Sequence, residues 1–170
     1  MNKMFLCGAA MAAVLFSAGA GEILKSWNFA DPEEQKLVEA RNKATCTFNA
    51  ETKTVTLQLP AAKQEWPAVL SFRFPGASFQ QGQTIVVKFD VKASSACTLR
   101  ANIGLAEAPY SHFSAMSYIE AGTDWKSFTI KLKITGKVPG DKQISVPALV
   151  AEKANPGTTI EFRNLSVERE

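Results

Sequence analysis

TIVVKFDVKA, residues 84–93 of this 170-residue sequence, carries the clearest signal of its architecture. Every second position carries an apolar side chain, namely Ile85, Val87, Phe89, Val91 and Ala93. Successive side chains of a β-strand point to opposite faces, so this spacing predicts a strand with one buried face. Lys88, Asp90 and Lys92 lie on the other face, which we expect to meet solvent.

Similar alternation recurs along most of the chain, at residues 54–59, 70–74, 99–105, 128–134 and 144–150. In the last run we expect Ile144, Val146, Ala148 and Val150 to share one inward face. Turn residues separate the runs, as at Pro75-Gly76. Short strands at this spacing without interleaved helices predict an all-β fold, an antiparallel two-sheet β-sandwich. Asp31-Pro32-Glu33-Glu34 has the N-cap, proline and acidic residues of a helix start and predicts one short surface helix.

The C-terminal stretch TIEFRNLSVE, residues 159–168, changes phase halfway. Ile160 and Phe162 alternate with polar residues, and the apolar positions then step by three to Leu165 before Val167. One extra residue in a strand shifts the pleat in this way, so we predict a β-bulge at Arg163-Asn164.

Residues 1–20, MNKMFLCGAAMAAVLFSAGA, read as a signal peptide cleaved before Gly21, and a short membrane anchor is the alternative. We expect residues 21–170 to form a single β-sandwich domain, secreted or placed in the periplasm or at the cell surface. Without Lys3, 18 basic residues stand against 16 acidic ones. This balance gives no reason to expect nucleic acid or an anionic membrane as a partner, and no later apolar segment is long enough to span a bilayer.

Two cysteines remain after cleavage, Cys46 and Cys97, each on the same face of its strand as a neighbouring apolar residue. Both thiols are therefore expected to point inward. Because an exported chain reaches an oxidising compartment, they are candidates for a disulfide, with two free buried thiols as the alternative.

Three stretches together resemble the CenC-like carbohydrate-binding modules of the family 4/9 type: residues 79–94 (FQQGQTIVVKFDVKAS), 121–134 (AGTDWKSFTIKLKI) and 157–168 (GTTIEFRNLSVE). The resemblance implies a jelly-roll sandwich of galactose-binding-like topology that binds polysaccharide. It also implies a structural calcium ion, although this chain has Asn164 where family tails often carry the aspartate that helps to hold it. Such modules are usually attached to a catalytic domain, so a separate glycan-active enzyme or an envelope protein is an expected partner.

Sugar binding needs exposed aromatic faces and a few placed polar groups. Tyr110 and His112 cluster beside Pro109, and Trp66 stands next to Pro67 outside any alternating run. Trp66 is either a stacking platform or a lid over one end of the core. We take the following as candidate ligand-binding residues for a neutral or weakly acidic glycan: Trp66, Arg73, Arg100, Asn102, Tyr110, His112 and Tyr118.

Catalytic readings find little support in the sequence. His112 is the only histidine, no nucleophile motif accompanies it, and the acidic residues show no paired spacing. We therefore expect a secreted, non-catalytic carbohydrate-binding module. The alternative is a structural or adhesion sandwich that binds another envelope or extracellular protein, and a small sandwich hydrolase or lyase is a third reading.

Overall fold

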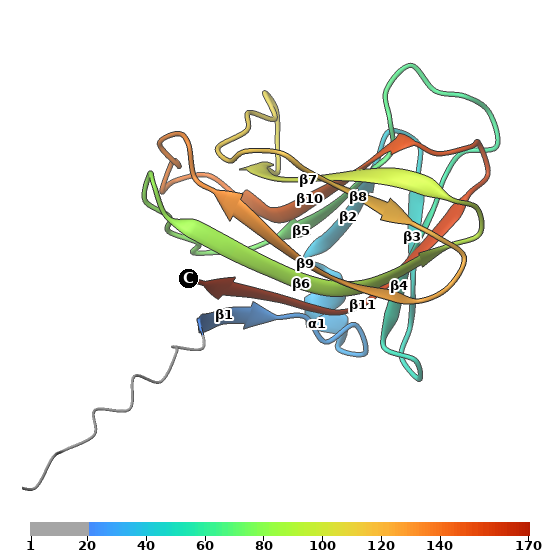
Figure 1. Ribbon diagram of the computed structural model, residues 1–170, viewed down its shortest axis with the longest axis horizontal. Helices are drawn as coiled ribbons and strands as arrows, with labels where there is room; N and C mark the ends of the chain where they lie inside the picture. The colour runs from blue at the N-terminus through green and yellow to red at the C-terminus, as the bar shows by residue number, and fades with distance from the viewer. Residues whose placement is uncertain (1–20) are drawn as a thin grey trace, which may run out of the picture.

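A computed structural model describes residues 21–170, which form two antiparallel sheets packed face to face (Figure 1). The six-stranded sheet has the order β3-β4-β11-β6-β9, and β1 pairs with the second half of β11. Its strands are β1 (Glu22–Ser26), β3 (Thr45–Asn49), β4 (Thr54–Gln58), β6 (Thr84–Ala93), β9 (Lys126–Lys133) and β11 (Thr159–Arg169). The five-stranded sheet has the order β2-β5-β10-β7-β8. Its strands are β2 (Val38–Arg41), β5 (Val69–Arg73), β7 (Cys97–Leu105), β8 (Ser117–Ala121) and β10 (Ile144–Lys153).

The predicted all-β sandwich is confirmed, and the alternating residues form its core. The five alternating apolar residues of the stretch 84–93, from Ile85 to Ala93, are all between 0% and 4% exposed. Leu70 and Phe72 of β5 and Leu99 of β7 face them from the other sheet and are equally buried. Each sheet thus buries one face against the other, and the hydrophobic effect supplies the driving force for this packing.

The predicted bulge in the tail is present. The pairing of β11 with β6 shifts between Arg163 and Ser166, and Asn164 has a positive φ of 54°. On its other side, β11 pairs with β4 through residues 159–162 and with β1 through residues 166–169. The bulge therefore lies where the last strand exchanges one neighbour for another.

The prediction that Ala148 and Val150 point inward together with Ile144 and Val146 is wrong. The pairing of β10 with both β5 and β7 shifts between Ser145 and Ala148. The core accordingly contains Ile144 and Val146 before the shift and Leu149 and Ala151 after it. The cause is Pro147, which has no N–H to donate and is tolerated in a central strand only at a bulge. Ala148 and Val150 consequently lie on the outer face of the sheet.

The predicted short helix is present as α1 (Pro32–Gln35), with the Asp31 side chain accepting a hydrogen bond from the N–H of Glu33. The signal peptide predicted at residues 1–20 lies outside the described residues. Within residues 21–170, no helix has the length and apolar character needed to cross a membrane.

The candidate disulfide does not form, and Cys46 and Cys97 are free thiols. Both point inward as expected, because Cys97 belongs to the core and Cys46 packs against it. Cys46, however, lies on β3, which faces β2 at one edge of the sandwich, whereas Cys97 lies on β7, next to β8, which faces β9 at the other edge. The width of the sandwich separates them, and burial raises the pKa of each thiol.

Candidate functional site

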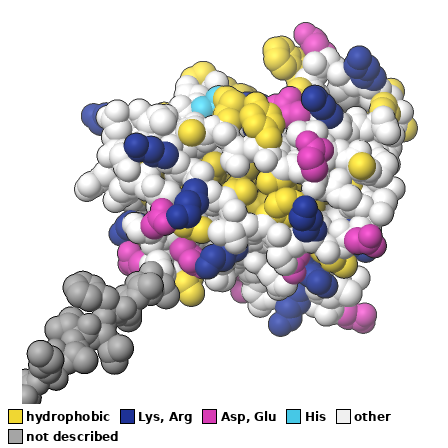
Figure 2. All heavy atoms as spheres, viewed as in Figure 1, with side chains coloured by type: hydrophobic (Ala, Val, Ile, Leu, Met, Phe, Trp, Pro, Cys, Tyr) yellow, Lys and Arg dark blue, Asp and Glu magenta, His cyan; other side chains and the backbone are white. Residues whose placement is uncertain are grey.

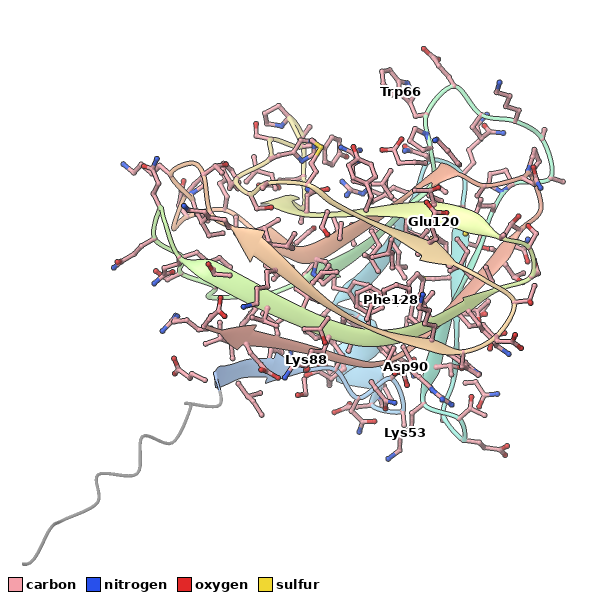
Figure 3. All side chains as sticks on the ribbon, in the orientation of Figure 1. Lys53, Trp66, Lys88, Asp90, Glu120 and Phe128 are labelled. Atoms are coloured by element: carbon pink, nitrogen blue, oxygen red, sulfur yellow. The ribbon has the colours of Figure 1, made fainter. Side chains whose placement is uncertain are left out.

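A hollow of about 760 Å³ opens on the outer face of the five-stranded sheet. Two loops border it: residues 59–68, between β4 and β5, and residues 106–116, between β7 and β8. Both loops rise from the upper part of the molecule in Figure 1, and Figure 3 shows Trp66 projecting from the first of them. Figure 2 shows the single histidine beside hydrophobic side chains on the same side of the molecule. We call this hollow the groove.

The floor of the groove is built from residues in register across four strands. One row runs from Arg41 of β2 through Val69 and Val150 to Arg100 of β7. The next row consists of Glu39, Ser71, Ala148 and Asn102. The middle of the floor holds small side chains, of which Val69, Ala148 and Val150 are apolar, and larger polar side chains stand at both ends, where they can bond to hydroxyls or charges.

Two exposed aromatic rings flank this floor, each on its own loop. Trp66 is 66% exposed and Tyr110 is 48% exposed. The Trp66 loop is tied to the β2–β3 turn by a hydrogen bond of 2.6 Å from the Asn42 amide to the Pro67 carbonyl. Trp66 also borders a second hollow of about 460 Å³ behind its loop, so the ring stands on a ridge between two depressions.

Gly104 of β7 lets the second loop lie close against the sheet. A Cβ atom there would come within 2.7 Å of the Ser111 carbonyl oxygen. That oxygen accepts a hydrogen bond of 2.9 Å from the Leu105 N–H, and Gly104 pairs with His112 as an isolated β-bridge. The absence of a side chain at Gly104 therefore places Tyr110 and His112 over the end of the groove.

Asn102 and His112 form the main polar contact at this end. The Asn102 amide nitrogen lies 2.9 Å from His112 Nδ1, and a hydrogen bond in this direction leaves the ring proton on Nε2. The Asn102 carbonyl oxygen is buried without a hydrogen-bond partner among residues 21–170. Partial burial of the ring lowers the pKa of His112, and the positive charge of Arg100 lowers it further. The imidazole is therefore neutral near pH 7 and offers an N–H donor.

The charged groups of the groove differ in their partners. Arg100 Nε lies 2.5 Å from Glu152 Oε1, and Glu39 is ion-paired with Arg73. Arg41 instead stacks on the Tyr110 ring, with its guanidinium carbon 4.5 Å from the ring centroid.

The structure brings together five of the seven residues selected from the sequence: Trp66, Arg100, Asn102, Tyr110 and His112 all line the groove. The other two lie beside it. Arg73 lies on β5 two residues after Ser71, outside the floor, and contacts a groove residue through its ion pair with Glu39. Tyr118, 60% exposed, lies on the edge strand β8 opposite Arg100 and extends the first row outward.

Several groove residues were not identified from the sequence: Glu39, Arg41, Asn42, Val69, Ala148 and Val150. The strand β2 was missed because only four residues alternate there, directly after the helix. The alternation of Val38 and Ala40 with Glu39 and Arg41 was the available signal. No comparable signal identified Ala148 and Val150, which depend on the shift at Pro147.

The residues at the tail bulge do not fit a calcium ion. The Asn164 amide donates a 2.8 Å hydrogen bond to Asp90 Oδ2, and Arg163 Nε lies 3.2 Å from the same oxygen. The nearest carboxylate is thus already neutralised by a guanidinium. Across the described part of the chain, no group of three or more His, Cys, Asp or Glu side chains is arranged to hold a metal.

Four acidic residues are candidates in principle for catalysis: Asp90, Glu107, Glu120 and Glu161. Glu107 Oε1 lies 3.9 Å from Lys142 Nζ. Asp90 and Glu161 belong to the outer face of the six-stranded sheet, where they pair with Arg163 and Lys92. Glu120 accepts a hydrogen bond from Thr98 on β7. None of the four lines the groove or the smaller hollow beside Trp66, whereas glycoside hydrolysis uses two carboxylates that flank the bond to be cleaved.

Comparison with known proteins shows similarity in structure. No protein-family model matches the chain, and no curated protein sequence matches it significantly. A CBM4 structure superposes with a TM-score of 0.61 at 15% identity, over 79% of this chain and 96% of that one. The second N-terminal cellulose-binding domain of Cellulomonas fimi β-1,4-glucanase C gives a TM-score of 0.65 at 13% identity, over 90% and 97% of the two chains. The CBM22-1 xylan-binding domain of Paenibacillus barcinonensis Xyn10C gives 0.60 at 13% identity, with the same coverage.

These similarities confirm, at the level of the fold, the resemblance to carbohydrate-binding modules that the sequence indicated. At such low identity they establish a shared β-sandwich over most of the chain. Ligand and site residues do not follow from fold alone.

Proposed function

We propose that this protein is a non-catalytic carbohydrate-binding domain that holds a glycan chain in the groove. The observation that carries the proposal is the pair of exposed rings, Trp66 and Tyr110, flanking one hollow on a single sheet face. Aromatic faces can stack on the apolar C–H surfaces of a pyranose, and the polar groups of Arg100, Asn102 and His112 can bond to its hydroxyls.

The groove suits an extended polymer. The rows cross the strands, and five strands spaced by about 4.8 Å give the sheet a width of roughly 19 Å. Tyr118, at the edge of the sheet, extends the surface available to a long ligand. Arg73 contributes by holding Glu39 in place. An extended glycan would make many contacts along the groove, and its affinity would be the sum of these individually weak contacts less the cost of ordering the ligand.

The proposal includes export. Residues 1–20 act as a signal peptide, and residues 21–170 work as one domain outside the cytoplasm, in the periplasm or at the cell surface. There the domain delivers glycan to, or retains it for, a separate glycan-active enzyme or an envelope protein.

The test measures retention on a panel of polysaccharides by affinity electrophoresis or calorimetry. Trp66→Ala and Tyr110→Ala should each weaken retention by about tenfold or more, equivalent to ~1.4 kcal/mol, because each removes a central contact. Both variants should keep the melting temperature of the parent.

Trp125→Ala is the matched control. Trp125 lies under Lys92 and Arg163, on the side of the sandwich opposite the groove. Its removal should leave retention unchanged. Unchanged retention in both groove variants would disprove the site, and a folded protein that binds no glycan but captures an envelope protein would favour the adhesion alternative.

A further inference from the structure

We propose that the glycan held in the groove is acidic, a polymer of uronic acids, and that Arg41 binds one of its carboxylates. The inference rests on the proposed function, because it assumes that a glycan occupies the groove. It goes further by naming the chemical class of the sugar and the residue that selects it.

Arg41 differs from the other arginines of residues 21–170. Four of the five have a carboxylate partner: Arg73 with Glu39, Arg100 with Glu152, Arg163 with Asp90 and Arg169 with Glu22. Within this part of the chain, Arg41 has no carboxylate oxygen within the 4.0 Å that defines the other pairs. A guanidinium cannot lose its proton at physiological pH, so Arg41 remains a cation that lacks a protein counter-charge.

The residues around Arg41 hold its side chain in place but leave most of its hydrogen-bond donors without a partner. Its guanidinium stacks 4.5 Å from the centroid of the Tyr110 ring, and Nη1 reaches only the Ala106 carbonyl at 3.5 Å. Its Nε is buried without a hydrogen-bond partner among the described residues. The stacking fixes the plane of a fork that presents parallel N–H groups, a geometry that matches the two oxygens of a carboxylate.

The carboxylates nearest to Arg41 are ion-paired with other arginines. Glu39 lies two residues away on the same face of β2 but is ion-paired with Arg73. Glu152 is paired with Arg100 on the far side of the floor. A ligand that enters the groove therefore meets one positive charge that no protein group neutralises. A carboxylate placed there gains a charge-assisted bond that a neutral sugar cannot make.

The experiment compares polymers that differ in charge and share a backbone. One pair is polygalacturonate and its fully methyl-esterified form, and another is β-1,4-glucuronan and β-1,4-glucan oligosaccharides. A sulfated β-1,4-glucan provides a second kind of anion. In each matched pair the acidic member should bind about tenfold more tightly, because it pairs with the uncompensated cation, and added salt should reduce this preference.

Arg41→Gln tests the residue. It should abolish the preference for the acidic member, so that the two members of each matched pair bind about equally to the variant. Arg169→Gln removes an arginine of the six-stranded sheet and should keep the preference. Should Arg41→Gln fail to fold, the matched pairs and their salt dependence in the parent protein still decide the matter.

The outcomes separate the two proposals. Equal or tighter binding of the neutral members, still dependent on Trp66, overturns the inference and leaves the proposed function intact. A preference that survives Arg41→Gln, or tight binding of the sulfated glucan without binding of either uronate, also overturns it. Binding to none of the polymers by the folded protein overturns the proposed function itself.

Discussion

The outer faces of the two sheets differ in how apolar and charged side chains are arranged. On the six-stranded sheet, charges face one another in register across neighbouring strands. Asp90 lies opposite Arg163, and Lys92 lies opposite Glu161 at 2.9 Å. On the five-stranded sheet, the corresponding rows have apolar centres at Val69 and Val150. In Figure 3, Lys88 and Asp90 lie in the lower half of the molecule and Trp66 lies at its top.

On the six-stranded sheet, these charged groups have their partners within the chain. Exposed cross-strand ion pairs keep a sheet soluble and discourage pairing with other chains, although each contributes only modestly to stability. The groove face instead holds an apolar floor, exposed aromatic rings and a guanidinium without a carboxylate. We propose that a bound glycan completes the contacts of these groups. Substitutions on each face and in the core should therefore have different effects on stability and on glycan retention.

The largest effect should separate Leu149 from Val150, adjacent residues on opposite faces of β10. Leu149→Ala should lower the free energy of unfolding by about 2–5 kcal/mol, because it leaves a cavity between the sheets. Val150→Ala should cost less, about 1–2 kcal/mol, because Val150, although only 4% exposed, lies outside the core cluster on the groove side, where no second sheet packs over it. Urea denaturation measures both. Equal losses, or a larger loss for Val150→Ala, would contradict the register shift at Pro147.

A smaller effect is expected at Gly104. The added methyl group of Gly104→Ala would lie 2.7 Å from a backbone oxygen, so the loop 106–116 must move. We expect a loss of about 1–3 kcal/mol in unfolding free energy, together with weaker glycan retention. Gly122→Ala is the control, since a Cβ there meets nothing within 4 Å. Retention that matches the parent would show that the loop position is not needed for binding.

The smallest effect is expected on the ion-paired face. A hydrogen bond from the Ser127 hydroxyl, with further bonds from Asn164 and Arg163, lowers the pKa of Asp90. Because the pKa of Asp90 is lower in the folded protein than the value of about 4 in the unfolded chain, its ionised carboxylate stabilises the fold above about pH 4. This stabilisation is lost as the pH falls through the folded-state pKa. Asp90→Asn should therefore cost less than about 1 kcal/mol at neutral pH.

Two observations would check this last change. The stability difference between Asp90→Asn and the parent should shrink below about pH 4, as thermal unfolding at several pH values can show. Glycan retention should stay the same. A stability difference that widens in acid would contradict the lowered pKa of Asp90. Loss of glycan binding in Asp90→Asn would mean that the two faces are not independent.

Much of the sandwich could be predicted because its signals are local. Alternation identified the inner faces of β5, β6, β7 and β9, and the three-residue step located the bulge beside Asn164. The resemblance in three stretches indicated the correct fold. The disulfide prediction failed because inward orientation of Cys46 and Cys97 says nothing about their separation across the sandwich.

The candidate site could be predicted only in part. Trp66, Tyr110 and His112 stood out because aromatic and imidazole groups next to proline interrupt the alternation. Arg41 gave no comparable signal, since its distinction is the lack of a carboxylate partner, which is a property of its neighbours in space. The roles of all these residues in binding remain predictions.

The order of amino acids alone specifies that each strand has one apolar face, because side-chain direction in a strand repeats every two residues. That rule was enough to specify two sheets closing on one core. The break of this alternation in β10 depends on the assembled sheet, because the register at Pro147 is set by hydrogen bonds to β5 and β7. It also gathered Arg41, Trp66, Asn102 and Tyr110 around one hollow, since strands distant in sequence become neighbours only when the sheet forms.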